Sequence, residues 1–154
     1  MKFVSMVNVT RGKEIESSHQ GVAVCIDSSG KILREWGDSN FLIYPRSSLK
    51  PVQSLNLYKN GMIDQLKIDD THLAFSTASH HGEEIHLAKA ETWLKDLGLN
   101  EDDLACGADW PKNLKDKFKA EKKFKQKRKV FHNCSGKHCA HLAVSKIRSL
   151  AIKD

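Results

Sequence analysis

The chain has 154 residues, of which 40% are hydrophobic, so it suits one domain, 1–154, with a real core and not a disordered chain. Its net charge of +6 comes from a basic insertion at residues 112–129, which contains ten Lys or Arg residues and two acidic ones. The rest of the chain carries a net charge of about −2, which argues against a general nucleic-acid-binding role. No apolar run approaches the ~20 residues of a membrane helix, and residues 1–10 are too short and interrupted for a signal peptide, so we expect no membrane association and a cytoplasmic location.

The first part of the chain has the pattern of β-strands. Residues 2–9 alternate enough to form one strand, and residues 21–27 are apolar and β-branched. A turn at 28–30 leads into residues 31–36, so this region predicts a hairpin.

The remainder is mostly helical, with a small apolar segment at 71–78 that we expect to be buried. Residues 112–129 are either an exposed helix or a mobile loop. Helices are predicted at 47–59, 82–97, 100–106 and 135–150. Strands followed by helices predict an α+β fold.

Residues 45–51 place Ser47 three positions before Lys50. If a helix starts at Ser47, the lysine amine lies one turn on and on the same face, which is the arrangement of a serine nucleophile activated by a lysine. The same S-x-x-K spacing occurs in penicillin-binding proteins and serine β-lactamases. Arg46 is a candidate ligand for a substrate carboxylate. The alternative is a plain helix start, with Ser47 or Ser48 as N-cap and Lys50 in solvent.

A second candidate, Ser79, follows the buried segment and precedes the helix at 82–97. A helix N-terminus presents backbone N–H groups that can hold an anion or a developing oxyanion. The alternative is an ordinary N-cap, which is common at this kind of position. Three nearby histidines are candidate metal ligands, although scattered histidines usually are not: His80, His81 and His86.

A third motif, Asn-Cys-Ser-Gly-Lys-His, occupies residues 133–138. Cys134 is a candidate zinc ligand, but its spacing to nearby ligands matches no standard zinc module. The alternative is a glycine-containing turn with a free buried cysteine. The possible partners of Cys134 are His132, His138, Cys139 and His141.

Phe118 and Phe124 are interleaved with the lysines of the basic insertion. Aromatic side chains among cations suit single-stranded nucleic acid. We favour the alternative, a solvated insertion with two anchoring aromatics.

Taken in chain order, these motifs resemble one family, the serine-dependent, zinc-containing L-asparaginases of the rhizobial type (class 3, L-asparaginase II). The Arg-Ser-Ser-x-Lys-Pro and Asn-Cys-Ser-Gly-Lys-His motifs are its most specific signatures. The matching segments are 9–12, 16–21, 37–38, 45–53, 78–86, 97–99, 106–111 and 133–138.

The resemblance implies a role for each matching residue. Ser47 and Ser79 correspond to the two catalytic serines, and Lys50 to the lysine partner of the first. Cys134 and Lys137 correspond to two zinc ligands, and a ligating lysine has to be deprotonated. The implied fold is the one shared by serine β-lactamases and glutaminases, usually as a homodimer. Substrate contacts are expected from Arg46, His80 and His138.

The chain also departs from the family. Family members are longer, and the lysine that pairs with the second serine and the remaining zinc-binding cysteine match nothing here. We therefore expect an incomplete fold and a truncated or split L-asparagine amidohydrolase, with a homodimer or a complementing C-terminal chain as its assembly. The alternatives are an inactive asparaginase-like fragment or a basic nucleic-acid-binding module that uses residues 112–129.

Overall fold

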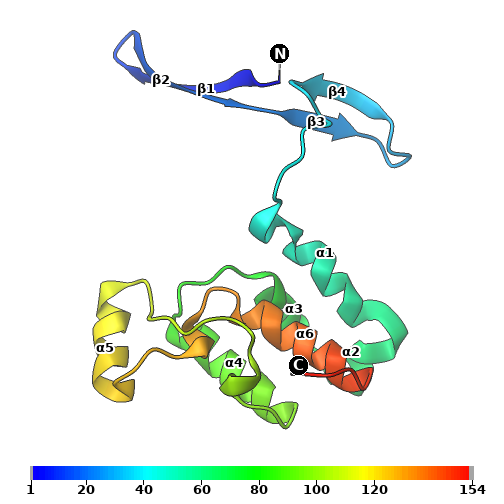
Figure 1. Ribbon diagram of the computed structural model, residues 1–154, viewed down its shortest axis with the longest axis vertical. Coiled ribbons are helices and arrows are strands. Elements are labelled where there is room, and N and C mark those ends of the chain that lie inside the picture. Colours follow the sequence, from blue (N-terminus) through cyan, green and yellow to red (C-terminus); the bar gives the residue numbers. More distant parts are fainter. Residues whose placement is uncertain (1, 153–154) are drawn as a thin grey trace. The chain divides into compact units, whose positions relative to one another are not determined.

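The computed structural model describes residues 2–152, apart from the side chain of residue 60 (Figure 1). The chain divides into two compact units, Met1–Tyr44 and Pro45–Asp154. Strands make up the first unit and helices the second, so the α+β expectation is confirmed. The expectation of a single domain stays a prediction.

The first unit consists of two antiparallel hairpins. β1 (Val4–Arg11) pairs with β2 (Glu14–Gly21), and β3 (Ala23–Ile26) pairs with β4 (Ile32–Trp36). The hairpin predicted around the turn at 28–30 is confirmed as β3 and β4. The sequence did not predict β2, because its residues are mostly polar and lack an alternation of apolar side chains.

No described residue of the first unit is buried. Its exposed large apolar side chains include Val7, Ile15, Ile26 and Trp36. A two-stranded hairpin is marginally stable in water unless one face packs against something. The first unit therefore gains little stability from its own contacts.

The described part of the second unit contains six α-helices joined by loops and short 3-10 segments. They are α1 (Lys50–Ser54), α2 (Met62–Gln65), α3 (Asp70–Thr77), α4 (Glu84–Asp96), α5 (Leu114–Phe124) and α6 (Ser135–Ile147).

The helix predicted at 47–59 is broken into shorter pieces. A 3-10 turn (Arg46–Leu49) leads into α1, and a second 3-10 segment (Leu55–Gly61) follows it. Pro51 explains the first break, because its ring cannot follow a regular α-helical turn and it has no N–H to donate. The predicted helix at 100–106 is a shorter 3-10 turn, Glu101–Asp103, which Asn100 caps as expected.

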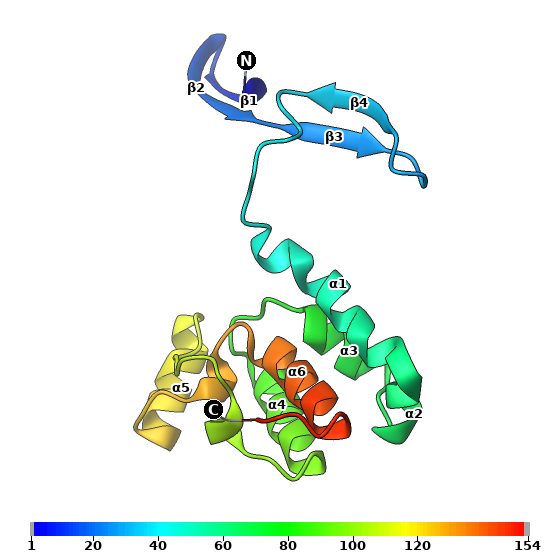
Figure 2. The ribbon, with the colours of Figure 1, turned by 45° about the vertical axis from the view of Figure 1, so that its right-hand side comes forward.

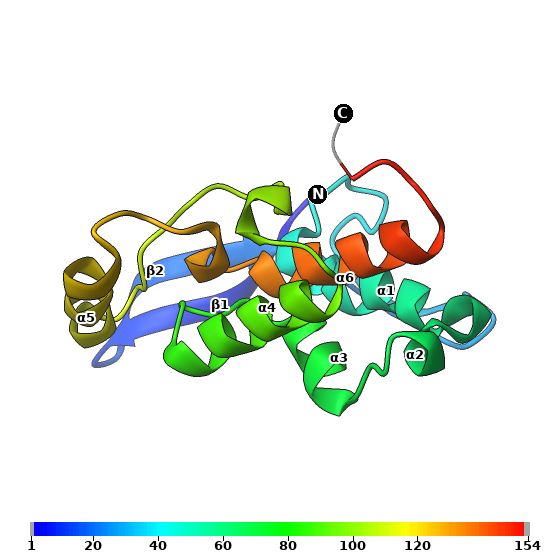
Figure 3. The ribbon, with the colours of Figure 1, turned by 90° about the horizontal axis from the view of Figure 1, so that it is seen from below.

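The core of the second unit lies where α3, α4 and α6 pack together (Figures 2 and 3). The apolar stripe predicted on α4 is buried, with Leu87, Ala90, Leu94 and Leu97 each at most 8% exposed. Trp93 joins them, and α6 contributes Cys139, Ala140 and Ala143. Burial of these side chains is the main stabilising contribution to this unit.

Gly136 lets α6 approach α3 closely. A Cβ at this position would lie 2.1 Å from the carbonyl oxygen of Phe75, which no side chain can accommodate. The requirement for glycine therefore places the start of α6 directly beside the end of α3. This close packing matters for function because both of these helix ends carry candidate site residues.

The basic insertion contains a regular helix, α5. Of the two predicted alternatives, residues 114–124 therefore form the helix and not the loop. The side chain of Asn113 caps its start by accepting hydrogen bonds from two backbone N–H groups. Phe124 anchors the helix against Phe131, with ring centroids 5.7 Å apart. The prediction that Phe118 is a second anchoring side chain is wrong. Phe118 is 63% exposed, because it lies on the outer face of α5.

Candidate active site

Three side chains of the predicted site meet in the second unit. The Oγ of Ser79 donates a hydrogen bond to the Oγ of Ser47 (2.8 Å), and the Nζ of Lys50 donates to the Oγ of Ser79 (2.9 Å). Ser47 lies in the 3-10 turn before α1, Lys50 begins α1, and Ser79 lies in the loop after α3. The expected convergence of these groups, 32 residues apart in sequence at the widest, is therefore present.

Lys50 is the buried member of this group, with 2% of its surface exposed. Its amine also donates to the backbone carbonyl oxygens of Ala78 and Asn133. These three acceptors account for the three hydrogens of an ammonium group. No described carboxylate contacts the amine, so its neighbours are dipoles and not charges. The alternative of a solvated lysine is thus wrong.

The two serines face solvent, where a substrate can reach them. Neither caps a helix: the 3-10 turn that holds Ser47 has no side-chain cap, and Glu83 holds the N-cap position of α4. The neighbouring Ser48 donates instead to the carbonyl oxygen of Pro45. The alternative of simple helix capping therefore accounts for neither Ser47 nor Ser79.

Arg46 directly precedes the first serine and has a φ of 52°, in the left-handed region that non-glycine residues rarely occupy. Such backbone strain is concentrated at functional sites in proteins. The guanidinium makes no hydrogen bond or ion pair with any described residue and is open to solvent. It is therefore available to a substrate anion.

His80 fastens the Ser79 loop to the start of α6. Its Nδ1 accepts a hydrogen bond from the N–H of Gly82 (3.1 Å), so Nε2 carries the proton and donates to the Oγ of Ser135 (2.9 Å). Both His80 and Ser135 are buried. With both ring nitrogens engaged inside the protein, these contacts favour a positioning role over the substrate contact that the resemblance implies, which stays a prediction.

Burial first, and then the nearby His86, lower the pKa of His80 to about 4, against a weaker opposing effect of Glu83. Lys50 and His132 also lower this pKa, by smaller amounts. The ring is consequently neutral in the folded protein, and the unfolded chain takes up a proton more readily between pH 6.5 and about 4.

We expect the free energy of unfolding to be unaffected by this group above pH 6.5 and to fall as the pH drops toward about 4. Urea unfolding at several pH values measures the slope. His80→Gln, which retains a donor for Ser135, should flatten it, whereas the exposed His81→Gln should not. An unchanged slope in His80→Gln would assign the acid sensitivity to other groups.

Glu83 and His86 lie beside His80, and the ligand atoms of the three lie within 4.8 Å of one another. A carboxylate and two histidines are a familiar ligand set. The rings of His80 and His86, however, are stacked, 4.7 Å apart and 13° from parallel. Parallel rings direct their lone pairs side by side and not toward one ion, so this cluster is better suited to support the loop. Its Glu83 carboxylate accepts from the N–H of His81 (3.0 Å) and pairs with His86 (2.9 Å).

The predicted zinc ligands lie at the start of α6. Cys134 precedes the helix and Lys137 lies in its first turn, three positions on, so the two side chains share a face. Among the described residues, Cys134 belongs to no group of three His, Cys, Asp or Glu ligands. Two ligands fall short of the three or four that zinc sites use, so this set alone does not fit the metal.

His138 follows in the same turn but makes no hydrogen bond with Ser47, Lys50 or Ser79 among the described residues. Burial, and then Lys137, lower its pKa to about 4. It is a neutral imidazole next to the predicted ligands. Its expected role as a substrate ligand stays a prediction.

We expect only weak zinc binding by this chain, because Cys134 and Lys137 supply two ligands. Equilibrium dialysis against zinc, with Cys134→Ser as the variant and the exposed Cys25→Ser as the matched control, measures it. Stoichiometric zinc that survives dialysis in the wild type would show that His138, His141 or Cys139 completes the site.

Sequence reasoning missed the groups that hold the site together. The carbonyl oxygens of Ala78 and Asn133 carry no side-chain signal, so the sequence offered no way to find them. Ser135 lies inside the Asn-Cys-Ser-Gly-Lys-His motif, and that position was the available signal.

The serine–lysine network and the motif at the start of α6 lie together in the second unit, joined by the hydrogen bond from the amine of Lys50 to the carbonyl oxygen of Asn133. A model of the L-asparaginase II family matches residues 7–154. The chain belongs to the L-asparaginase II family. A comparison with curated proteins found no match. No helix within the described residues of this L-asparaginase II family member is long and apolar enough to cross a membrane.

Proposed function

We propose that this chain carries the serine–lysine machinery of an L-asparagine amidohydrolase, which converts asparagine to aspartate and ammonia. The observation that supports it is the continuous hydrogen-bond chain from the amine of Lys50 through Ser79 to Ser47. Hydroxyl hydrogens rotate, so the same chain can carry a proton in the opposite direction when the amine is neutral. A neutral Lys50 then acts as general base for either serine.

In the first half of the reaction, a serine Oγ attacks the side-chain amide carbon while its proton moves to the amine of Lys50. The C–N bond breaks, and the leaving nitrogen takes that proton to depart as ammonia, leaving an ester on the serine. Water attacks the ester in the second half, releases aspartate and returns the proton to the serine. Ser79 contacts the amine of Lys50 directly, and Ser47 reaches it through Ser79. Either serine can therefore be the nucleophile, because each has a route for its proton to the amine.

The substrate is held by groups around the two serines. The unpaired guanidinium of Arg46 suits the α-carboxylate of asparagine, which it can bind through two parallel hydrogen bonds. Backbone N–H groups near Ser79 are proposed to stabilise the oxyanion that forms on the amide oxygen when the serine adds to the carbon. No step of this scheme passes through zinc.

We further propose that the fold is the one shared by serine β-lactamases and glutaminases and that a second polypeptide completes the working site. This second polypeptide is another copy or a complementing chain. Two observations support the need for a second polypeptide: no described residue of the first unit is buried, and Cys134 belongs to no described group of three His, Cys, Asp or Glu ligands. Mixing experiments that restore turnover would identify the partner.

The test uses covalent capture, which needs an activated serine but no turnover. A diazoketone analogue of asparagine should alkylate Ser47 or Ser79, and peptide mass spectrometry should locate the adduct. Ser47→Ala or Ser79→Ala should abolish or redirect it. Ser48→Ala is the matched control and should label as wild type, because Ser48 lies outside the network. Labelling that is indifferent to both alanine variants would refute the proposal.

A further inference from the structure

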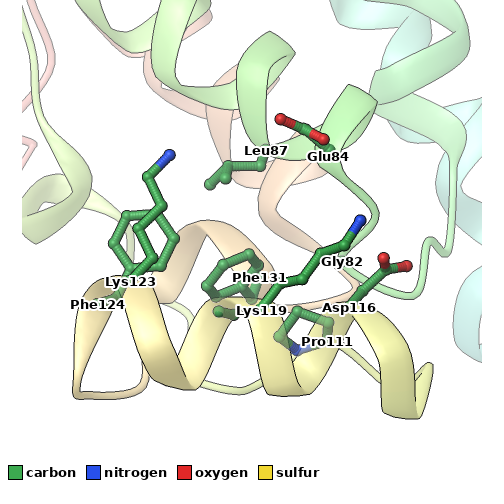
Figure 4. Close-up of a pocket in the computed structure, with 10 residues that line it drawn as sticks. Gly82, Glu84, Leu87, Pro111, Asp116, Lys119, Lys123, Phe124 and Phe131 are labelled. Carbon is green, nitrogen blue, oxygen red and sulfur yellow. The ribbon is translucent and has the colours of Figure 1, made fainter.

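A cavity of about 170 Å³ lies between the start of α4 and the inner face of α5 (Figure 4). None of Ser47, Lys50 and Ser79 lines it. The residues that form it are Gly82, Glu84, Leu87, Pro111, Asp116, Lys119, Ala120, Lys123, Phe124 and Phe131. The basic insertion thus forms one wall of a cavity, a role that the proposed reaction does not use.

The floor of the cavity is apolar and belongs to the core. Leu87 is 8% exposed, Phe131 3% and Ala120 5%, so these side chains are held by their other contacts. Phe124 packs edge-on against Phe131 and closes one end. A floor of fixed apolar groups suits a branched or aromatic side chain of a ligand.

Charges of both signs surround this floor. Lys119 and Asp116 lie one turn apart on α5, and Glu84 lines the cavity from the start of α4. In Figure 4 the tip of Lys119 turns toward the end of the cavity where Asp116 lies, whereas Lys123 stands beside Phe124 at the other end. Glu84, Asp116 and Lys119 form no side-chain hydrogen bond or ion pair with any described residue, so they remain available to a ligand.

We propose that this cavity binds a free apolar α-amino acid, with its side chain on the apolar floor and its zwitterionic head between the unpaired charges. Lys119 binds the α-carboxylate, and Asp116 and Glu84 bind the α-ammonium. A simple carboxylate would lie against two acidic groups, and a simple amine against two lysines. A zwitterion is the small ligand whose charges complement both sets. The polar side chain of asparagine does not suit the apolar floor.

The experiment follows backbone amide shifts of the ¹⁵N-labelled full chain during titration with L-leucine and L-phenylalanine. For a ligand of this size a dissociation constant on the order of 1 mM is expected. Shifts should gather on residues 82–87 and on α5. The probes 3-phenylpropionate, which lacks the ammonium, and phenethylamine, which lacks the carboxylate, should bind at least about fivefold more weakly.

Variants separate this cavity from the serine site. Lys119→Gln and Asp116→Asn should each weaken binding at least about fivefold, whereas Lys122→Gln, on α5 outside the cavity, should leave it unchanged. Ala120→Leu, which fills the cavity, should abolish binding while amide dispersion reports that the chain is folded; if it does not fold, the charge variants decide. No shift at 20-fold the expected constant, equal binding of the two truncated probes, or shifts confined to Ser47 and Ser79 would each overturn the proposal. The measurement needs no turnover, so it stands independently of the asparaginase proposal.

Discussion

The purified chain is expected to release little or no ammonia from asparagine. Two observations motivate this result: Lys50 is the one amine hydrogen-bonded to a site hydroxyl among the described residues, and Cys134 belongs to no group of three His, Cys, Asp or Glu ligands there. The family resemblance implies a second lysine and a further cysteine that the motifs of this chain do not supply. Loss of one member of a catalytic unit costs on the order of 10⁴–10⁶ in rate.

A coupled assay for ammonia, run beside Ser47→Ala and Ser79→Ala, measures this. The two variants define the background, and the wild type should lie within a few-fold of it. Robust turnover that either substitution abolishes would show that these 154 residues suffice for catalysis. The first unit also exposes apolar side chains and strand edges, so size-exclusion chromatography with light scattering should show self-association.

Lys50→Met should slow covalent capture of the serines by a factor of about 10²–10⁴. Methionine fills nearly the same volume but cannot accept the serine proton, and it leaves the carbonyl oxygens of Ala78 and Asn133 without their donor. The measurement is the rate of alkylation by the diazoketone analogue. Lys59→Met, at an exposed position of the 3-10 segment after α1, is the control and should react as wild type.

A second variant separates base catalysis from structural support. Lys50→Arg keeps a donor for each carbonyl oxygen but stays protonated, so it cannot act as a base. It should unfold at a similar urea concentration to the wild type and still capture the reagent as slowly as Lys50→Met. Labelling by Lys50→Arg at the wild-type rate would show that the amine only holds the loop.

Much of the second unit could be predicted from the sequence. The period of Leu87, Ala90, Leu94 and Leu97 was enough for α4, because a helix buries one stripe and that stripe is visible in the residue order. In the first unit, the hairpin of β3 and β4 was also visible, because the turn at 28–30 separates an apolar, β-branched run from a second strand-like segment. β2 was missed because its residues are mostly polar and lack an alternation of apolar side chains.

Other features depended on contacts between distant segments. The break in the helix expected at 47–59 is an exception, because its cause, Pro51, is visible in the sequence. The role of His80 also depended on tertiary structure, because nothing beside it in sequence announces that Ser135 will accept its proton 55 residues later. Local order indicates which groups are present but not which of them share a buried hydrogen bond.

For the site itself, the sequence alone determined the reactive groups and their family, through the spacing of Ser47 and Lys50 and the motif at 133–138. Only the tertiary structure decided that the amine donates directly to Ser79 and that it is enclosed by two carbonyl oxygens. The physical reason lies at Gly136, where the absence of a side chain allows α6 to reach the backbone of Phe75. That close approach brings the carbonyl oxygen of Asn133 to the amine of Lys50. The sequence alone does not reveal this contact, because it joins segments that are distant in the chain.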